Sequence, residues 1–280
     1  MTPFREVLAA LWVAVRSVRV SLLLWVVFTA IALPVAWTAS HSVGMDGARW
    51  NSPVVLPADA DVFSHLQLDL AGPLVLAFVL GILFAGCILA TVGTDGPRVA
   101  LRDFLARGAR AFLANFRVIL LFTLGAVLLS WGLDALDARI RSSLETVSPG
   151  ATLDLIGVHV RFVHLLLLWD LARGLLFLAL LLTCKIAMAT VTGGRRRSAF
   201  VAGLTAVATV LRHPYRVAVA VLTWALIWIG GSLAFGELTV RMLEVRADLV
   251  LGAVAGEAGV LFAIVGWVGF TLSARRIAEA

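Results

Sequence analysis

The stretch ATVGTDGPRVALRDFLARGARAFLANFRV, from Ala90 to Val118, recurs in this chain without a gap. Moved forward by 99 positions, its matching residues fall on the segment from Ala189 to Val217. In both copies an apolar run ends, a glycine-containing turn leads to arginine, a helix-length stretch follows, and an Arg-Val step opens the next apolar run. This order of features predicts a membrane exit, a surface helix and a re-entry.

The composition indicates a protein whose solvent is lipid. Of the 280 residues, 61% are hydrophobic and 14% are charged, with a mean hydropathy of +1.00. A soluble domain is about half apolar and about a quarter charged. The apolar residues here gather into runs long enough to cross a bilayer as helices. The sequence therefore predicts an all-α integral membrane protein.

The apolar runs predict six transmembrane helices within a single membrane domain over residues 1–280. The spans cover about residues 20–39, 70–92, 118–136, 168–191, 217–236 and 249–272. The fourth span has two alternative starts, because residues 162–169 can either cross or lie along the outer surface. The first span also resembles a secretory signal peptide, with a basic start, an apolar run and small residues, so cleavage is an alternative there.

Apolar residues at helical spacing predict three helices along the inner membrane surface. They cover about residues 4–19, 98–114 and 197–213. The first two are amphipathic. The third is apolar nearly all round, so it needs contact on both sides, and it ends at His213 because a proline follows.

The distribution of arginine predicts the orientation. With the N-terminus inside, the cytoplasmic segments hold fifteen arginines and the external segments hold six, together with most of the acidic residues. Because short cytoplasmic segments are enriched in basic residues, both termini are predicted to be cytoplasmic. The net charge of +6 is then divided by the membrane, and no nucleic-acid partner is expected.

The repeat extends beyond its best copy. An Arg-Val step opens three outgoing spans, and an Asp-Leu step precedes three returning spans. The steps are Arg19-Val20, Arg117-Val118 and Arg216-Val217, and then Asp69-Leu70, Asp170-Leu171 and Asp248-Leu249. The unit is an inner helix, an outgoing span, an external segment and a returning span. Three units of the same topology predict a threefold parallel helical-hairpin repeat, unlike the inverted repeats of many transporters.

Three ionisable residues in the spans, Asp170, Arg173 and Glu257, form a candidate polar cluster inside the membrane. Ionisable groups at membrane depth are costly and often functional. Asp170 and Arg173 are one helical turn apart, and Glu257 is expected at a similar depth. The alternatives are a structural Asp170–Arg173 ion pair and a protonated, hydrogen-bonded Glu257. A fourth residue, Lys185, is expected to extend its ammonium to the inner headgroups.

Seven arginines are candidate contacts for anionic lipid headgroups or for a protein partner on the cytoplasmic face. They are Arg98, Arg102, Arg107, Arg110, Arg195, Arg196 and Arg197. On the helix from 98 to 114, Arg107 and Arg110 share the polar face with Asp103. The partners expected from this pattern are the lipid bilayer, its anionic headgroups and a cytoplasmic protein.

Motifs that carry chemistry are missing from the sequence. Cys87 and Cys184 lie in apolar runs and read as packing residues, and the histidines lack ligand spacing for a metal. There is no glycine-rich phosphate loop, no Gly-x-Ser-x-Gly elbow and no His-Glu-x-x-His pattern. No catalytic residue, cofactor or metal is assigned.

The connector from Arg195 to Ala199, followed by Leu211 to Pro214, resembles that of bacterial multi-pass inner-membrane proteins with an "RRSAL…RHP" pattern. The resemblance covers about residues 170 to 222 and implies an inner-membrane location without catalysis. The leading hypothesis is a non-catalytic subunit or scaffold of a membrane assembly. The alternatives are a permease for an apolar or anionic solute and, with least support, an intramembrane enzyme.

Overall fold

A computed structural model of the chain describes residues 3–42, 75–92, 100–145, 152–155, 158–194, 198–246 and 249–279. This part of the chain is almost entirely helical. Five helices are long and apolar enough to cross a membrane, or six if the bent pair Pro3–Arg16 and Val18–Ile31 is one span. These helices confirm the prediction of an all-α, multi-pass membrane protein.

The helices follow one another with few irregular residues between them. The elements are α1 (Pro3–Arg16), α2 (Val18–Ser42), the span Val75–Val92 with its π-helical last turn η1 (Ile88–Val92), α5 (Leu101–Glu145), β1 (Thr152–Leu155), β2 (Val158–Arg161), α6 (Phe162–Thr192), α7 (Ala199–Arg212), α8 (Pro214–Arg246) and α9 (Leu249–Glu279). The strands β1 and β2 pair antiparallel, with Thr152 opposite Arg161, and join α5 to α6. The ambiguous residues 162–169 form the first turns of α6, in one helix with the predicted span.

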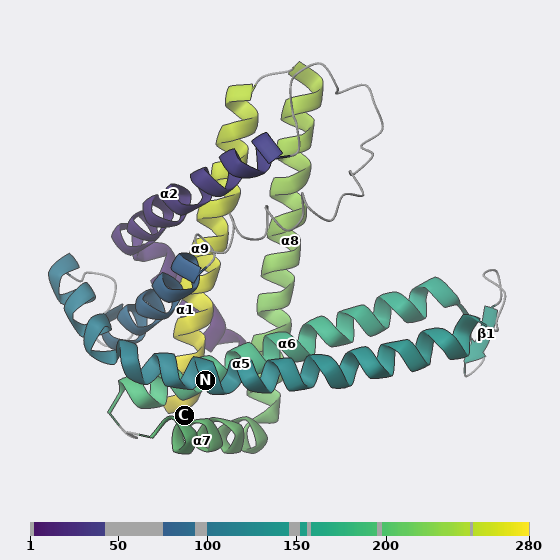
Figure 1. The fold of residues 1–280 in the computed structure, drawn as a ribbon, viewed down its shortest axis with the longest axis horizontal. Helices are drawn as coiled ribbons and strands as arrows, with labels where there is room; N and C mark the ends of the chain where they lie inside the picture. The colour runs from purple at the N-terminus through teal and green to yellow at the C-terminus, as the bar shows by residue number, and fades with distance from the viewer. Residues whose placement is uncertain are drawn as a thin grey trace.

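Two helical hairpins extend in different directions from one end of the molecule (Figure 1). We call this end the base; it holds α1, α7 and both chain termini. The hairpin α5–α6 runs to one side, and the hairpin α8–α9 runs away from it. The helices therefore bury one another chiefly near the base. In the most apolar 18-residue stretch of α5, only 11% is buried within the protein. Most of this helix therefore faces lipid or another protein.

The protein core lies where α9 meets its neighbours. α9 contacts α1, α2, α6, α8 and η1. Glycines in α9 admit the indole rings of α8, since a Cβ added to Gly269 would lie 2.4 Å from the Trp224 ring and one added to Gly266 would lie 2.8 Å from Trp228 Nε1. The indole Nε1 of Trp224 also donates to Ser273 Oγ over 3.1 Å, so its polar atom is satisfied in the core.

The structure corrects one predicted boundary. The surface helix 98–114 and the span 118–136 are not separate, because α5 runs unbroken from Leu101 to Glu145. At the equivalent places in the other two repeat units, α1 and α2 meet at Ser17 with a 72° bend, and α7 ends at Arg212, with His213 as its C-cap before Pro214. No glycine or proline occurs from Ala109 to Leu124, so nothing in the local sequence ends the helix.

Candidate functional site

Three spans end together at the base, and each carries a buried threonine in its last turns. Thr91 donates to the carbonyl of Cys87 over 2.6 Å, Thr190 to that of Ile186 over 2.9 Å, and Thr271 to that of Trp267 over 2.9 Å. A threonine hydroxyl bonded to the carbonyl four residues earlier is satisfied inside its own helix. The three helix ends can therefore pack closely without stranding a hydroxyl group.

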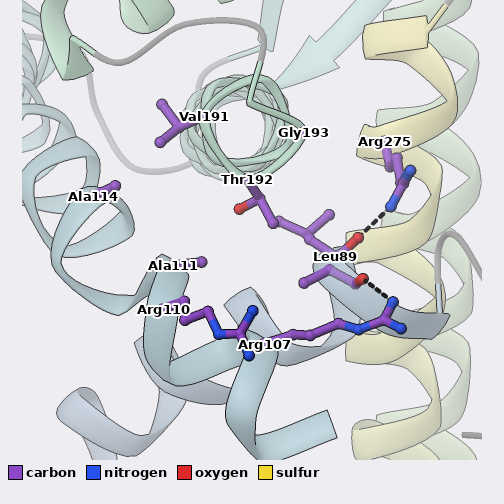
Figure 2. A pocket seen from close by; sticks show the side chains of 10 residues that line it. Leu89, Arg107, Arg110, Ala111, Ala114, Val191, Thr192, Gly193 and Arg275 are labelled. Carbon is purple, nitrogen blue, oxygen red and sulfur yellow. Dashed lines mark hydrogen bonds between the residues drawn. The ribbon is translucent and has the colours of Figure 1, made fainter. Parts of the chain in front are cut away.

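A cavity of about 330 Å³ lies between these helix ends and the first turns of α5 (Figure 2). Arginines from two helices line it, Arg107 and Arg110 from α5 and Arg275 from α9. Its remaining walls include Leu89 and Thr192, the latter from the last residues of α6. None of the lining residues in the described ranges is acidic, so we call this cavity the arginine pocket.

Arg107 and Arg275 donate hydrogen bonds to carbonyl groups in the last turns of the span Val75–Val92. Nη1 of Arg275 donates to the carbonyl of Leu89, and Nη1 of Arg107 donates to that of Ala90 over 3.5 Å. Figure 2 shows the two side chains reaching these carbonyls from opposite sides. The last carbonyls of a helix lack partners within the helix and carry partial negative charge, so cations are favoured there. Arg107 and Arg275 therefore have a structural role as well as a charge.

Arg110 differs from the other two arginines of the pocket. It makes no hydrogen bond, ion pair or ring contact within the described part of the chain, and it lies next to Arg107 in the pocket (Figure 2). A guanidinium binds phosphate and carboxylate oxygens through parallel N–H bonds. The pocket can therefore bind an anion, with Arg110 as the group that has no competing contact.

The predicted cytoplasmic arginines divide into three groups. Arg102, Arg107 and Arg110 are all exposed on α5, but only Arg107 and Arg110 line the pocket. Arg98, Arg195, Arg196 and Arg197 lie outside the described residues. The sequence analysis missed Arg275 as a site residue. Arg275 and Arg276 were counted only among the fifteen cytoplasmic arginines, although a basic pair directly after the last apolar run was a signal for a headgroup contact.

The structure does not bring Asp170, Arg173 and Glu257 together. Among the described residues, Arg173 of α6 pairs with Asp134 of α5. Asp170 is exposed and lines a separate cavity of about 460 Å³ between α6 and α8. Beside the Arg173 pair, Trp169 Nε1 donates to Asp137 Oδ1 over 3.1 Å. These contacts join α6 to its own hairpin partner, because the two hairpins separate away from the base (Figure 1).

Glu257 has partners from a helix that the sequence analysis did not consider. Its Oε2 accepts a hydrogen bond from Trp25 Nε1 over 2.7 Å and another from Thr29 Oγ1 over 3.5 Å. Both donors belong to α2. The contact matches the alternative of a hydrogen-bonded carboxyl group inside the bundle, without Arg173.

Lys185 does not extend to the membrane surface as expected. Its residue is 5% exposed, and its Nζ lies 4.8 Å from the centroid of the Trp267 ring in α9. The expectation was wrong because Lys185 lies within residues 182–191 of α6, all of which are buried by neighbouring helices. The side chain of Lys185 is therefore buried within the bundle.

No group of three or more His, Cys, Asp or Glu residues within the described ranges is placed to hold a metal ion. Both cysteines are free and buried, which keeps their thiols within the packed part of the bundle. No protein family, curated protein or solved structure matches this chain.

Proposed function

We propose that this chain is a non-catalytic bacterial inner-membrane protein, a subunit or scaffold of a membrane assembly, whose base binds anionic lipid headgroups at the cytoplasmic surface. The observation that carries the proposal is the arginine pocket. Among the residues that the structure describes, its lining presents three guanidinium groups and no carboxylate, and one of the three, that of Arg110, makes no hydrogen bond or ion pair there. A phosphate group matches this set of donors.

The helices at the base support a position on the membrane surface. α1 buries small residues such as Ala10 and Ala14 against the bundle, while Phe4, Leu8 and Trp12 stay outside the protein core. α7 shows the same arrangement: Ala202 and Ala206 are buried, and the large apolar side chains of Phe200, Leu204 and Leu211 are exposed. Large apolar side chains on a short helix next to arginines are typical of a helix at the lipid interface.

The orientation is part of the proposal. The segments that build the base, namely α1, the first turns of α5, α7 and the end of α9, carry nine of the chain's 22 arginines. Basic residues concentrate on the cytoplasmic side of bacterial membrane proteins. A cytoplasmic base also places the pocket beside an anionic leaflet, where each arginine is attracted to the surface.

The threefold repeat also belongs to the proposal. Its support comes from equivalent positions with the same burial, namely Val20, Val118 and Val217, which are 5%, 0% and 5% exposed. Thr91 and Thr190, which lie at the 99-residue offset and make the same bond within their helices, are a second such set. A parallel repeat of hairpins explains why three returning helices end at one place.

The assembly role is supported by the surface of α5. Leu120, Leu124, Leu128 and Trp131 form a row along the helix, and each is at least 58% exposed. Such a row can contact lipid tails or the helix of another subunit. A permease has weaker support, since the three polar residues expected along its path lie in different contacts.

Retention of lipid by the purified protein tests the proposal. After exchange into detergent with equal amounts of phosphatidylglycerol and phosphatidylcholine, we expect native mass spectrometry to find phosphatidylglycerol retained. Arg110→Gln should weaken this retention about five-fold, since one basic residue near an anionic surface contributes about 1 kcal/mol. Arg102→Gln is the matched control, because it removes the same charge from an equally exposed class of position on the same helix, outside the pocket. Equal losses in the two variants would refute a specific pocket.

A further inference from the structure

A second cavity, away from the base pocket, is lined by a buried lysine. It has a volume of about 300 Å³ and lies between α5, α6 and the span Val75–Val92. Eleven of the described residues line it, and among them Lys185 is the only ionisable one apart from the thiol of Cys184. Aromatic and aliphatic side chains, including Phe122 and Phe177, form most of its wall. Ligand sites of this kind are mainly apolar, with a few polar groups that orient the ligand.

Lys185 lacks an acidic partner in the described part of the chain. The contact found for its ammonium group is the one with the Trp267 ring, at 4.8 Å from the centroid. Burying a cation away from water is costly unless an anion or hydrogen-bond acceptors surround it, and a cation–π contact offsets only part of this cost. An anion at Lys185 would complete the environment of this residue.

The cavity is open to the lipid. Phe78 and Leu181 line it and are 50% and 40% exposed, which places them at the border between the cavity and the hydrocarbon. A ligand that enters here must therefore be soluble in the bilayer. One ammonium without arginines beside it matches a singly charged carboxylate better than a phosphate, for which the forked guanidinium group is better suited.

We propose that this cavity binds a long-chain carboxylic acid from the bilayer, with the carboxylate at Lys185 and the first part of the acyl chain along the apolar wall. The remainder of the chain lies among the lipid tails beyond Phe78 and Leu181. This site is independent of the arginine pocket, because it shares no residue with that pocket. The membrane ligand would stabilise the contact between α5 and α6.

Photolabelling with a diazirine analogue of palmitic acid tests the proposal on the full chain in detergent. We expect labelled residues to map to α5 and α6 around the cavity, and palmitate to compete for the site while its methyl ester does not. Lys185→Met, which keeps the length of the side chain and removes the charge, should reduce labelling about ten-fold or more. Lys185→Arg should retain most of it.

A second variant, Ala126→Phe, tests whether a loss of labelling comes from the occupied cavity or from misfolding caused by the loss of Lys185. Ala126→Phe places a ring into the cavity and leaves Lys185 in position, so it should also abolish labelling. Arg110→Gln in the base pocket should leave palmitate labelling unchanged. The proposal is overturned if the methyl ester competes as well as the acid, if phosphatidylglycerol competes better than palmitate, or if a correctly folded Lys185→Met protein is labelled like the wild type.

Discussion

Glu257 of α9 and Trp25 of α2 are joined by a hydrogen bond in which the indole Nε1 donates to Oε2 over 2.7 Å. The bond fixes α2 against α9 beyond the 72° bend that separates α2 from α1. Polar groups in an apolar environment are costly when they lack partners, so each residue satisfies the other. Glu257 is therefore an anchor between two helices and not part of a charge cluster with Arg173.

We predict that Glu257→Leu is much more destabilising than Glu257→Gln. Leucine leaves the indole N–H of Trp25 without an acceptor, which costs about 1–3 kcal/mol, whereas glutamine retains an acceptor oxygen. Thermal unfolding in detergent measures the difference. In a Trp25→Phe background the loss caused by Glu257→Leu should be smaller. Strong coupling between Glu257 and Arg173 in a double-mutant cycle would contradict this assignment.

Asn115 occupies the position in α5 at which the other two copies of the repeat change direction. It is fully buried, and its Oδ1 accepts a hydrogen bond from Thr192 Oγ1 over 3.2 Å. We predict that Asn115→Pro destabilises the protein by about 3 kcal/mol or more, because proline interrupts a continuous helix. Asn115→Ala should cost about 0.5–1.5 kcal/mol through the lost side-chain bond alone. Equal melting temperatures for the two variants would show that α5 is already interrupted at Asn115 in the wild-type protein.

Close packing of α8 on α9 depends on Gly269. A Cβ at this position would lie 2.4 Å from the Trp224 ring, so Gly269→Ala should destabilise by about 1–3 kcal/mol through overpacking. Gly174 is the matched control, because nothing lies within 4 Å of an added Cβ there. Gly174→Ala should be neutral or stabilise by up to about 1 kcal/mol. Chemical denaturation in detergent compares them, and a destabilising Gly174→Ala would argue against the packing explanation.

The proposed orientation predicts which side of the membrane each segment faces. Single cysteines at Ser143, near the end of α5, and at Ser198, before α7, should react with a membrane-impermeant maleimide from opposite sides. We expect Ser143→Cys to be labelled in intact cells and Ser198→Cys only after permeabilisation. The two native cysteines are buried and should give little background. The reverse pattern would place the base outside the cell.

Features that depend on neighbouring positions in the chain were predictable. The apolar runs indicated the helices, since the length of a run and its periodicity are local properties. The same local pattern placed Arg107 and Arg110 together on one face of α5. It failed at Asn115, where a polar residue and an Arg-Val step resembled a boundary, although no helix breaker was present.

Pairings between distant segments were not predictable. Arg173 lies one turn from Asp170 but pairs with Asp134, 39 residues away, and Arg275 reaches the carbonyl of Leu89 across 186 residues. Hydropathy does not specify how a helix is rotated about its axis, or which helix lies beside it. The sequence by itself therefore determined the helices, the lipid environment and the charge of the base. Only tertiary packing decided that Lys185 is buried, that Glu257 bonds to Trp25 and that three arginines share one pocket, because these depend on how the helices pack against one another.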